Sequence, residues 1–159
     1  MISINHDSEY KIDFVIPQGP PGPNPPVCYI DYGVSSNRFL TIKDYKIFNS
    51  NGEFSVSNNN IIVEPGTYEI TFCGRVDVNN DFESPITVAL HEDLGSGFSQ
   101  IVGDMSFVLQ KGTKLMQFSE TKLITFNNKK TLMAFVSNNN AVTVTVSMGS
   151  LILKKVLTS

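Results

Sequence analysis

A succession of short apolar runs, each closed by turn residues, constrains the fold of this chain more than any other feature of its sequence. Beyond residue 27, segments rich in β-branched and aromatic residues recur at intervals of roughly 8–12 residues, separated by turns such as Asn51-Gly52 and Pro65-Gly66. Asn and Gly tolerate positive φ angles and therefore close hairpins. The expected strands are residues 27–32, 39–42, 45–48, 61–63, 68–76, 86–91, 98–109, 115–126, 131–136 and 142–157. No segment keeps an apolar period of about 3.6 residues between helix caps, so the sequence predicts an all-β sandwich or barrel with almost no helix.

The faces of two segments indicate how these strands are buried. Within residues 68–76, Tyr68, Ile70 and Phe72 point to one side and polar residues to the other, which is typical of a half-buried antiparallel strand. Residues 151–153, Leu-Ile-Leu, are apolar on both faces. A strand of this kind is covered on both sides, by the second sheet or by a neighbouring subunit.

The first 27 residues differ in composition from the rest and suggest three zones. Residues 1–16 alternate apolar and polar side chains, which predicts an N-terminal strand that serves for attachment. Residues 17–27 form a Pro/Gly-rich spacer with two collagen-type triplets, Gly19-Pro20-Pro21 and Gly22-Pro23-Asn24. Proline fixes φ, so this stretch is either a stiff extended spacer or a short collagen-like stem. Residues 28–159 make up the β domain.

Charge and hydropathy exclude some classes of partner. The net charge is −3, and no basic run is longer than two residues, so we expect no nucleic-acid partner. No apolar run approaches the roughly 20 residues that cross a bilayer, so we expect no membrane insertion. The N-terminus lacks the basic and apolar pattern of a signal peptide.

Residues capable of catalysis are sparse. The chain has two histidines, His6 and His91, and it has no Gly-x-Ser-x-Gly or phosphate-binding glycine motif. His91 and Asp93 share a strand face, but two ligands do not make a metal site. Cys28 and Cys73 fit two buried free thiols or a disulfide, and no Cys-x-x-Cys pair is present. We therefore expect no enzymatic activity, no cofactor and no bound metal.

Several segments carry a family resemblance. They are residues 62–70, Ile-Val-Glu-Pro-Gly-Thr-Tyr-Glu-Ile, residues 86–90, the Val-Thr repeat at 141–146, and Gly149-Ser-Leu-Ile-Leu-Lys154. With the preceding Gly-Pro triplets, they resemble the C-terminal domains of collagen-like spore-surface glycoproteins, which belong with the complement and tumour-necrosis-factor-like trimeric jelly rolls. The junction Phe14-Val-Ile-Pro-Gln-Gly-Pro20 resembles that of phage tail-fibre proteins. The chain lacks the long triplet stem of the former and the length of the latter.

The resemblance implies an antiparallel β-sandwich of tumour-necrosis-factor-like jelly-roll topology and a homotrimer. We expect a non-enzymatic surface or fibre-tip module that mediates attachment or assembly, outside the cell or on a spore exosporium or virion. The alternative is an adhesin that binds a glycan or receptor, and a carbohydrate-active enzyme is a third, weaker reading. Expected partners are a particle scaffold or cell-surface carbohydrate. Candidate binding residues at the loop tips are Asn58, Asn59, Asn79, Asn80, Phe82, Phe98 and Asn139. Candidate residues for trimer contacts are Phe107, Leu109, Phe118, Leu151 and Leu153.

Overall fold

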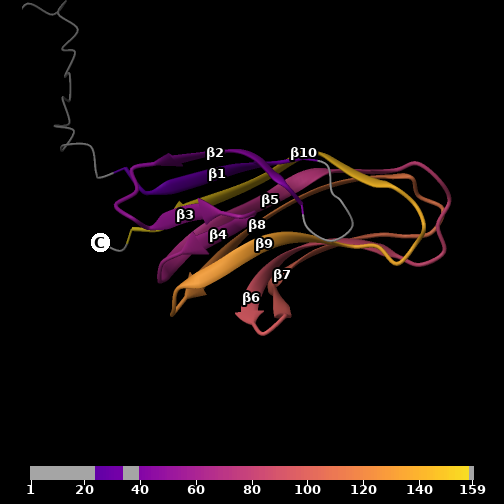
Figure 1. Cartoon of the computed structure of the whole chain (residues 1–159). Coiled ribbons are helices and arrows are strands. Elements are labelled where there is room, and N and C mark those ends of the chain that lie inside the picture. Colours follow the sequence, from indigo (N-terminus) through magenta and orange to yellow (C-terminus); the bar gives the residue numbers. More distant parts are fainter. Residues whose placement is uncertain (1–23, 34–39, 158–159) are drawn as a thin grey trace, which may run out of the picture.

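The computed structural model describes residues 24–33 and 40–157, which form a sandwich of two antiparallel sheets (Figure 1). In these residues the strands are β1 (Val27–Tyr32), β2 (Ile42–Phe48), β3 (Phe54–Ser57), β4 (Asn60–Val63), β5 (Gly66–Val78), β6 (Ile86–Gly95), β7 (Phe98–Leu109), β8 (Leu115–Phe126), β9 (Lys130–Ser137) and β10 (Val144–Lys155). The predicted all-β architecture is confirmed.

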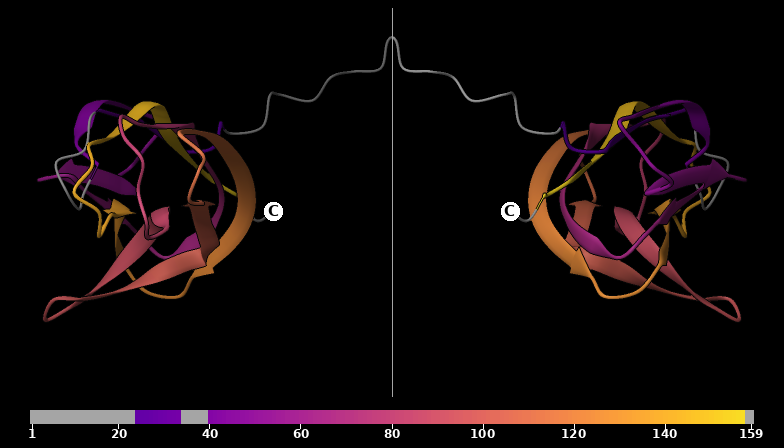
Figure 2. Two further views of the ribbon diagram at one scale, coloured as in Figure 1. Left: turned by 90° about the vertical axis from the view of Figure 1, so that its right-hand side faces the viewer. Right: turned by 90° about the vertical axis from the view of Figure 1, so that its left-hand side faces the viewer.

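The order of strands shows that the chain passes repeatedly from one sheet to the other. One sheet, here called sheet A, has the order β2-β1-β10-β5-β8, and the other, sheet B, has the order β3-β4-β9-β6-β7. The C-terminal strand β10 lies between β1 and β5, so it closes the sheet in which the described domain begins. Figure 2 shows the two layers in views that look along the strands. This crossing pattern is that of a jelly roll.

Strand boundaries differ from the prediction in two places. The segment 42–48 is one continuous strand, β2, where the sequence suggests two short strands. Strand β3 was not predicted, because only Phe54 of its four residues is buried and its serines give it little apolar signal. It is an edge strand, joined to β4 by a turn in which Asn58 and Asn59 both have positive φ angles. The predicted strand at residues 1–16, the start of the spacer and residue 39 lie outside the described residues.

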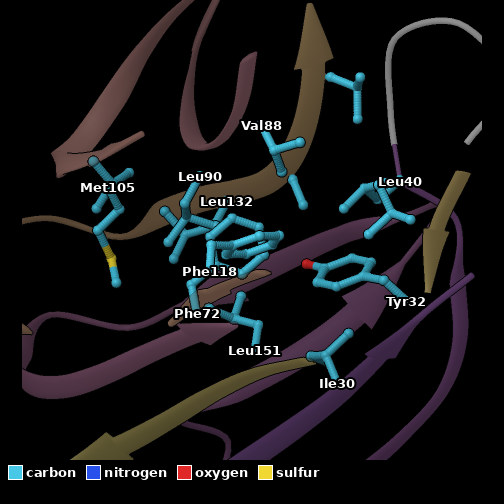
Figure 3. Packing of buried hydrophobic residues seen from close by; sticks show 14 of the residues in the cluster. Ile30, Tyr32, Leu40, Phe72, Val88, Leu90, Met105, Phe118, Leu132 and Leu151 are labelled. Carbon is cyan, nitrogen blue, oxygen red and sulfur yellow. The ribbon is translucent and has the colours of Figure 1, made fainter. Parts of the chain in front are cut away.

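An aromatic cluster in the middle of the core joins the two sheets (Figure 3). The Phe72 ring of β5 lies 5.1 Å from that of Phe118, 6.0 Å from that of Phe107 and 6.3 Å from that of Tyr32, measured between ring centroids. Phe107 belongs to sheet B, and the other three residues belong to sheet A. Aromatic rings bury large apolar areas, so this cluster is a principal contact between the layers.

The core also takes up the residues expected at a trimer interface. Leu109, Phe118, Leu151 and Leu153 are buried within the single chain, and Phe107 is half-buried and packs against the same core. The three leucines point between the sheets and cannot also reach a neighbouring subunit, so for them the expectation is corrected: the second sheet covers their side chains. Phe107 is only half-buried, and Phe118 also lines the hollow beside Met148.

The two cysteines lie on opposite faces of sheet A and are both free thiols. Cys28 of β1 is part of the core, and burial raises the pKa of its thiol to about 12. Cys73 of β5 is half-buried on the outward side of the sheet. Side chains on opposite faces point away from each other, so the disulfide alternative is excluded.

Tyr32 carries an unusual buried hydroxyl group. Its side chain is 3% exposed and points into the cluster of Figure 3, and its Oη has no hydrogen-bond partner among the described residues. Burial raises the pKa of this phenol far above its ordinary value. An unsatisfied buried hydroxyl destabilises the folded state, because it has lost its bonds to water.

Removal of this hydroxyl should therefore stabilise the protein. We expect Tyr32→Phe to increase the free energy of unfolding by about 1 kcal/mol, since the ring contacts remain and only the unpaired group is lost. Urea unfolding at fixed chain concentration measures the change. A decrease in stability would mean instead that the hydroxyl group is hydrogen-bonded in the folded protein.

Candidate functional site

The outward face of sheet A is a broad surface that the rest of the described chain leaves uncovered. Because side chains alternate along a strand, residues next to core positions in β1, β2, β5, β8 and β10 point away from sheet B. Register places them in rows across the sheet. One row runs Lys46, Tyr29, Ile152, Thr71 and Thr121. We call this surface, with its neighbouring rows, the outward face of sheet A.

Polar groups on this face are hydrogen-bonded to one another. The hydroxyl of Ser150 bridges Tyr29 and Asp31, at 3.2 Å from each. Two pairs of threonine hydroxyls join β5 to β8, Thr71 to Thr121 at 2.7 Å and Thr67 to Thr125 at 2.9 Å. Since their bonds are made within the sheet, these groups would lose little if the face were covered.

An ion pair lies at the far end of the same face. The Arg75 guanidinium donates hydrogen bonds to the Asp77 carboxylate through two nitrogens, with a closest distance of 2.8 Å. The hydrogen bond from Arg75 lowers the pKa of Asp77, and the same bond raises the pKa of Arg75. The carboxylate therefore stays ionised and its charge is partly neutralised within the sheet.

Large apolar side chains are exposed around these polar pairs. Leu123 of β8 is 68% exposed and lies opposite Glu69 on the outward side. Met148 is 72% exposed at the bulge of β10, beside a hollow of about 390 Å³ that also includes Cys73 and Arg75. Phe48 and Leu115 are exposed on the same side of β2 and β8. An apolar surface of this kind is typical of a face that contacts a partner.

Two of the five asparagines predicted at binding loops have structural contacts. The side-chain oxygen of Asn59 accepts the backbone N–H of Ile42, and that of Asn79 accepts the backbone N–H of Thr143. Asn140 joins the β9–β10 loop to the β5–β6 loop: its oxygen accepts the N–H groups of Glu83 and Ser84. These amides fix loop geometry, which sequence alone cannot distinguish from ligand contact.

The remaining loop candidates differ in how far their side chains are buried. Phe82 is 4% exposed and belongs to the core, so its ring is not available to a ligand; that expectation is corrected. Asn58, Asn80 and Asn139 are exposed. Phe98, at the β6–β7 hairpin, is 71% exposed. Of the predicted aromatic candidates, only Phe98 presents its ring to solvent.

A buried acid lies in a cleft between the edges of the two sheets. Glu92 of β6 is 7% exposed, and its carboxylate accepts hydrogen bonds from Lys130 Nζ at 2.5 Å and Gln100 Nε2 at 3.2 Å. The cleft has a volume of about 300 Å³ and extends along β7 and the β8–β9 turn. The sequence could have indicated that Glu92 points inward, because it lies two residues after the core residue Leu90 and alternate residues of a strand share a face. Its two partners account for both carboxylate oxygens, so the group serves as a structural ion pair.

His91 lies on the outward face of sheet B. Its Nδ1 is 2.9 Å from the Ser99 hydroxyl, and its ring centroid is 4.9 Å from that of Phe135. Burial lowers the pKa of the imidazole. In the described part of the chain, no group of three or more His, Cys, Asp or Glu residues is placed to hold a metal ion.

Comparisons with known proteins found similar folds but no match in sequence. No family model matches the chain, and no curated protein matches it. Among solved structures, murine APRIL at pH 5.0 superposes with a TM-score of 0.58 at 6% identity, over 84% of this chain and 99% of that one. Eiger TNF from S. frugiperda superposes with a TM-score of 0.57 at 10% identity, over 86% and 95%. The predicted tumour-necrosis-factor-like jelly roll is confirmed; at these identities the likeness shows the fold alone. Within the described ranges, no helix has the length and apolar character needed to cross a membrane.

Proposed function

We propose that this chain is a non-enzymatic structural module that assembles as a homotrimer through the outward face of sheet A and serves attachment or assembly at the surface of a particle or cell. One observation carries the proposal. The outward face of sheet A combines exposed apolar side chains with polar groups that are already bonded to one another. The trimeric order draws support from the tumour-necrosis-factor-like fold.

The energetic balance of this face favours association. Burial of apolar area contributes about 25 cal/mol per Å², so exposed side chains such as Leu123 and Met148 favour contact with a partner. Polar groups normally oppose such contact because they lose water. Here Ser150 and the threonine pairs keep their hydrogen bonds when water leaves. The apolar gain is therefore not cancelled by unsatisfied hydroxyl groups.

The charges on the face favour a second copy of the chain as the partner. They are of both signs: Lys154 lies opposite Glu69, Arg75 pairs with Asp77, and Lys46 and Asp44 lie opposite Tyr29 and Asp31. A surface with both signs can pair with itself, whereas a strongly charged polymer would meet repulsion on any approach. Self-association is the pairing that needs no other molecule.

The setting of the trimer is part of the proposal. The Pro/Gly-rich spacer before β1 suits a module held at a fixed distance from its attachment point, because proline-rich segments are stiff. The two collagen-type triplets favour a spore surface or a phage fibre. Outside the cell, the neutral Asn- and Ser-rich loop tips would face the surroundings. A second candidate role, recognition of a glycan, is favoured by the exposed Phe98 ring.

The first test is the mass of the protein in solution. Native mass spectrometry or light scattering at micromolar concentration should give three chains. A single chain at that concentration would contradict the proposal, and a dimer would retain self-association but reject the trimer.

The two native cysteines supply a second test of which face is covered. In the assembled protein we expect Cys73 to react slowly with a thiol reagent, because the outward face of sheet A is buried between subunits. In a dissociated variant, Cys73 should react readily while Cys28 reacts only after unfolding, since Cys28 is in the core. The measurement is the rate of thiol labelling in each state. Cys73→Ser is the control, and it should show no reactive thiol without denaturant. Equal labelling of Cys73 in trimer and monomer would place the interface elsewhere.

A further inference from the structure

A groove on the opposite sheet lies beneath the β6–β7 hairpin, which projects from the body of the sandwich (Figures 1 and 2). The groove has a volume of about 400 Å³ and lies between the hairpin and strand β9. Pockets that bind small molecules start at about 300 Å³. It is therefore large enough for a compact ligand, and it is remote from the outward face of sheet A.

The hairpin turn is built to hold its shape. Gly95, Ser96 and Gly97 have φ angles of +79°, +55° and +80°, a run of left-handed conformations that glycine adopts without strain. The Asp93 carboxylate fixes the start of the turn, since its Oδ1 accepts the N–H of Gly95 at 2.8 Å. The position of Phe98 directly after this turn is thereby defined, although its ring is 71% exposed.

The lining combines an apolar platform with oxygen groups. Two aromatic residues, Phe98 and Phe135, line the groove together with Met133, which is 9% exposed. Ser99, whose hydroxyl is bonded to His91, and Asp93, whose Oδ1 accepts the N–H of Gly95, also line the groove. The face of an aromatic ring is electronegative and attracts the C–H groups of a sugar ring, while carboxylate and hydroxyl groups bond its hydroxyls.

The charge of the lining selects among sugars. Among the described residues that line the groove, Asp93 is the one charged group, and none is a lysine or arginine. A sulfated or uronic-acid glycan would be repelled by Asp93 and would meet no cation among these described residues. A neutral pyranose would not be repelled by Asp93.

We propose that the groove between the β6–β7 hairpin and β9 is a binding site for neutral, pyranose-containing glycans, with Phe98 as the stacking platform and Asp93 and Ser99 as hydrogen-bonding groups. This inference deepens the glycan-binding candidate and does not depend on the trimer. If the trimer forms, it presents three such grooves on surfaces away from the subunit contacts, and simultaneous engagement of a polymer would increase avidity.

The experiment titrates the full-length protein by calorimetry with chitotriose, cellotriose and maltotriose, and with a heparin tetrasaccharide as the anionic probe. We expect at least one neutral sugar to bind and heparin not to bind. Phe98→Ala should weaken the binding by about tenfold, which corresponds to the loss of one aromatic contact of about 1.4 kcal/mol. Phe98→Tyr should retain the affinity, because the ring face is preserved, and Asp93→Asn should weaken it less than Phe98→Ala.

Leu94→Ala is the matched control, because Leu94 is an exposed apolar residue of the same hairpin that does not line the groove. Its affinity should equal that of the unchanged protein. Binding by none of the neutral sugars, binding by heparin alone, or equal affinity of Phe98→Ala and the unchanged protein would each overturn the assignment. Failure here leaves the oligomer mass unchanged, so the two proposals fail separately.

Discussion

Replacement of Ile152 by Asp should convert the proposed trimer into a folded monomer, whereas the same replacement at Leu153 should unfold the chain. The two residues are neighbours on β10, and register sends their side chains to opposite faces. Leu153 is fully buried in the core, and Ile152 lies half-buried in the row between Tyr29 and Thr71 on the outward face of sheet A. The same replacement at two neighbouring positions thus tests two surfaces.

The expected magnitudes differ because the surroundings differ. An isolated carboxylate at Leu153 would enter an apolar core with no partner, and its cost, together with the lost apolar contacts, is comparable to the total stability of a domain, about 5–15 kcal/mol. At Ile152, the carboxylate of the monomer faces water and costs little. In the trimer it would be buried against a neighbouring subunit without a partner, which opposes assembly.

Native mass and circular dichroism separate the outcomes. Ile152→Asp should keep the β-sheet spectrum and a cooperative unfolding transition at one-third of the mass, and Leu153→Asp should lose both. Ile152→Val is the control: it keeps an apolar side chain and should remain trimeric. A trimer in the Ile152→Asp variant would exclude the outward face of sheet A as the interface.

Replacement of Phe72 by Ala should reduce the free energy of unfolding by about 3–5 kcal/mol. Phe72 is fully buried and its ring is in contact with those of Tyr32, Phe107 and Phe118. Removal of the ring deletes its transfer free energy and leaves a cavity between the sheets that the neighbouring rings fill only in part. For a chain of this length, the midpoint of thermal unfolding should fall by roughly 10 °C or more.

Phe98→Ala is the matched comparison, since the same substitution removes an exposed ring. Its stability should remain within about 0.5 kcal/mol of the unchanged protein. Urea unfolding at one fixed chain concentration gives both values. A loss of less than about 1 kcal/mol at Phe72 would mean that the aromatic cluster does not hold the two sheets together.

The fold was largely predictable because its signals are local. Alternation in residues 68–76 and turn residues such as Asn51-Gly52 act over a few residues, and they led to the correct class and to most strands. Strand β3 escaped because a short, serine-rich edge strand takes its stability from pairing with β4 and not from its own composition. The sequence left open whether Cys28 and Cys73 are two free thiols or a disulfide, because it does not show which sheet face each residue occupies.

The candidate surfaces were less predictable because they depend on which face is covered. The apolar segment 151–153 by itself predicted that β10 would be covered on both sides, and period two determined that Ile152 points opposite to Leu151 and Leu153. Only the tertiary structure decided that the leucines face sheet B and Ile152 faces outward, and that Phe82 is buried while Phe98 is exposed. The physical reason is that alternation is set by the chemistry of one strand, whereas burial is set by strands distant in sequence that pack against it.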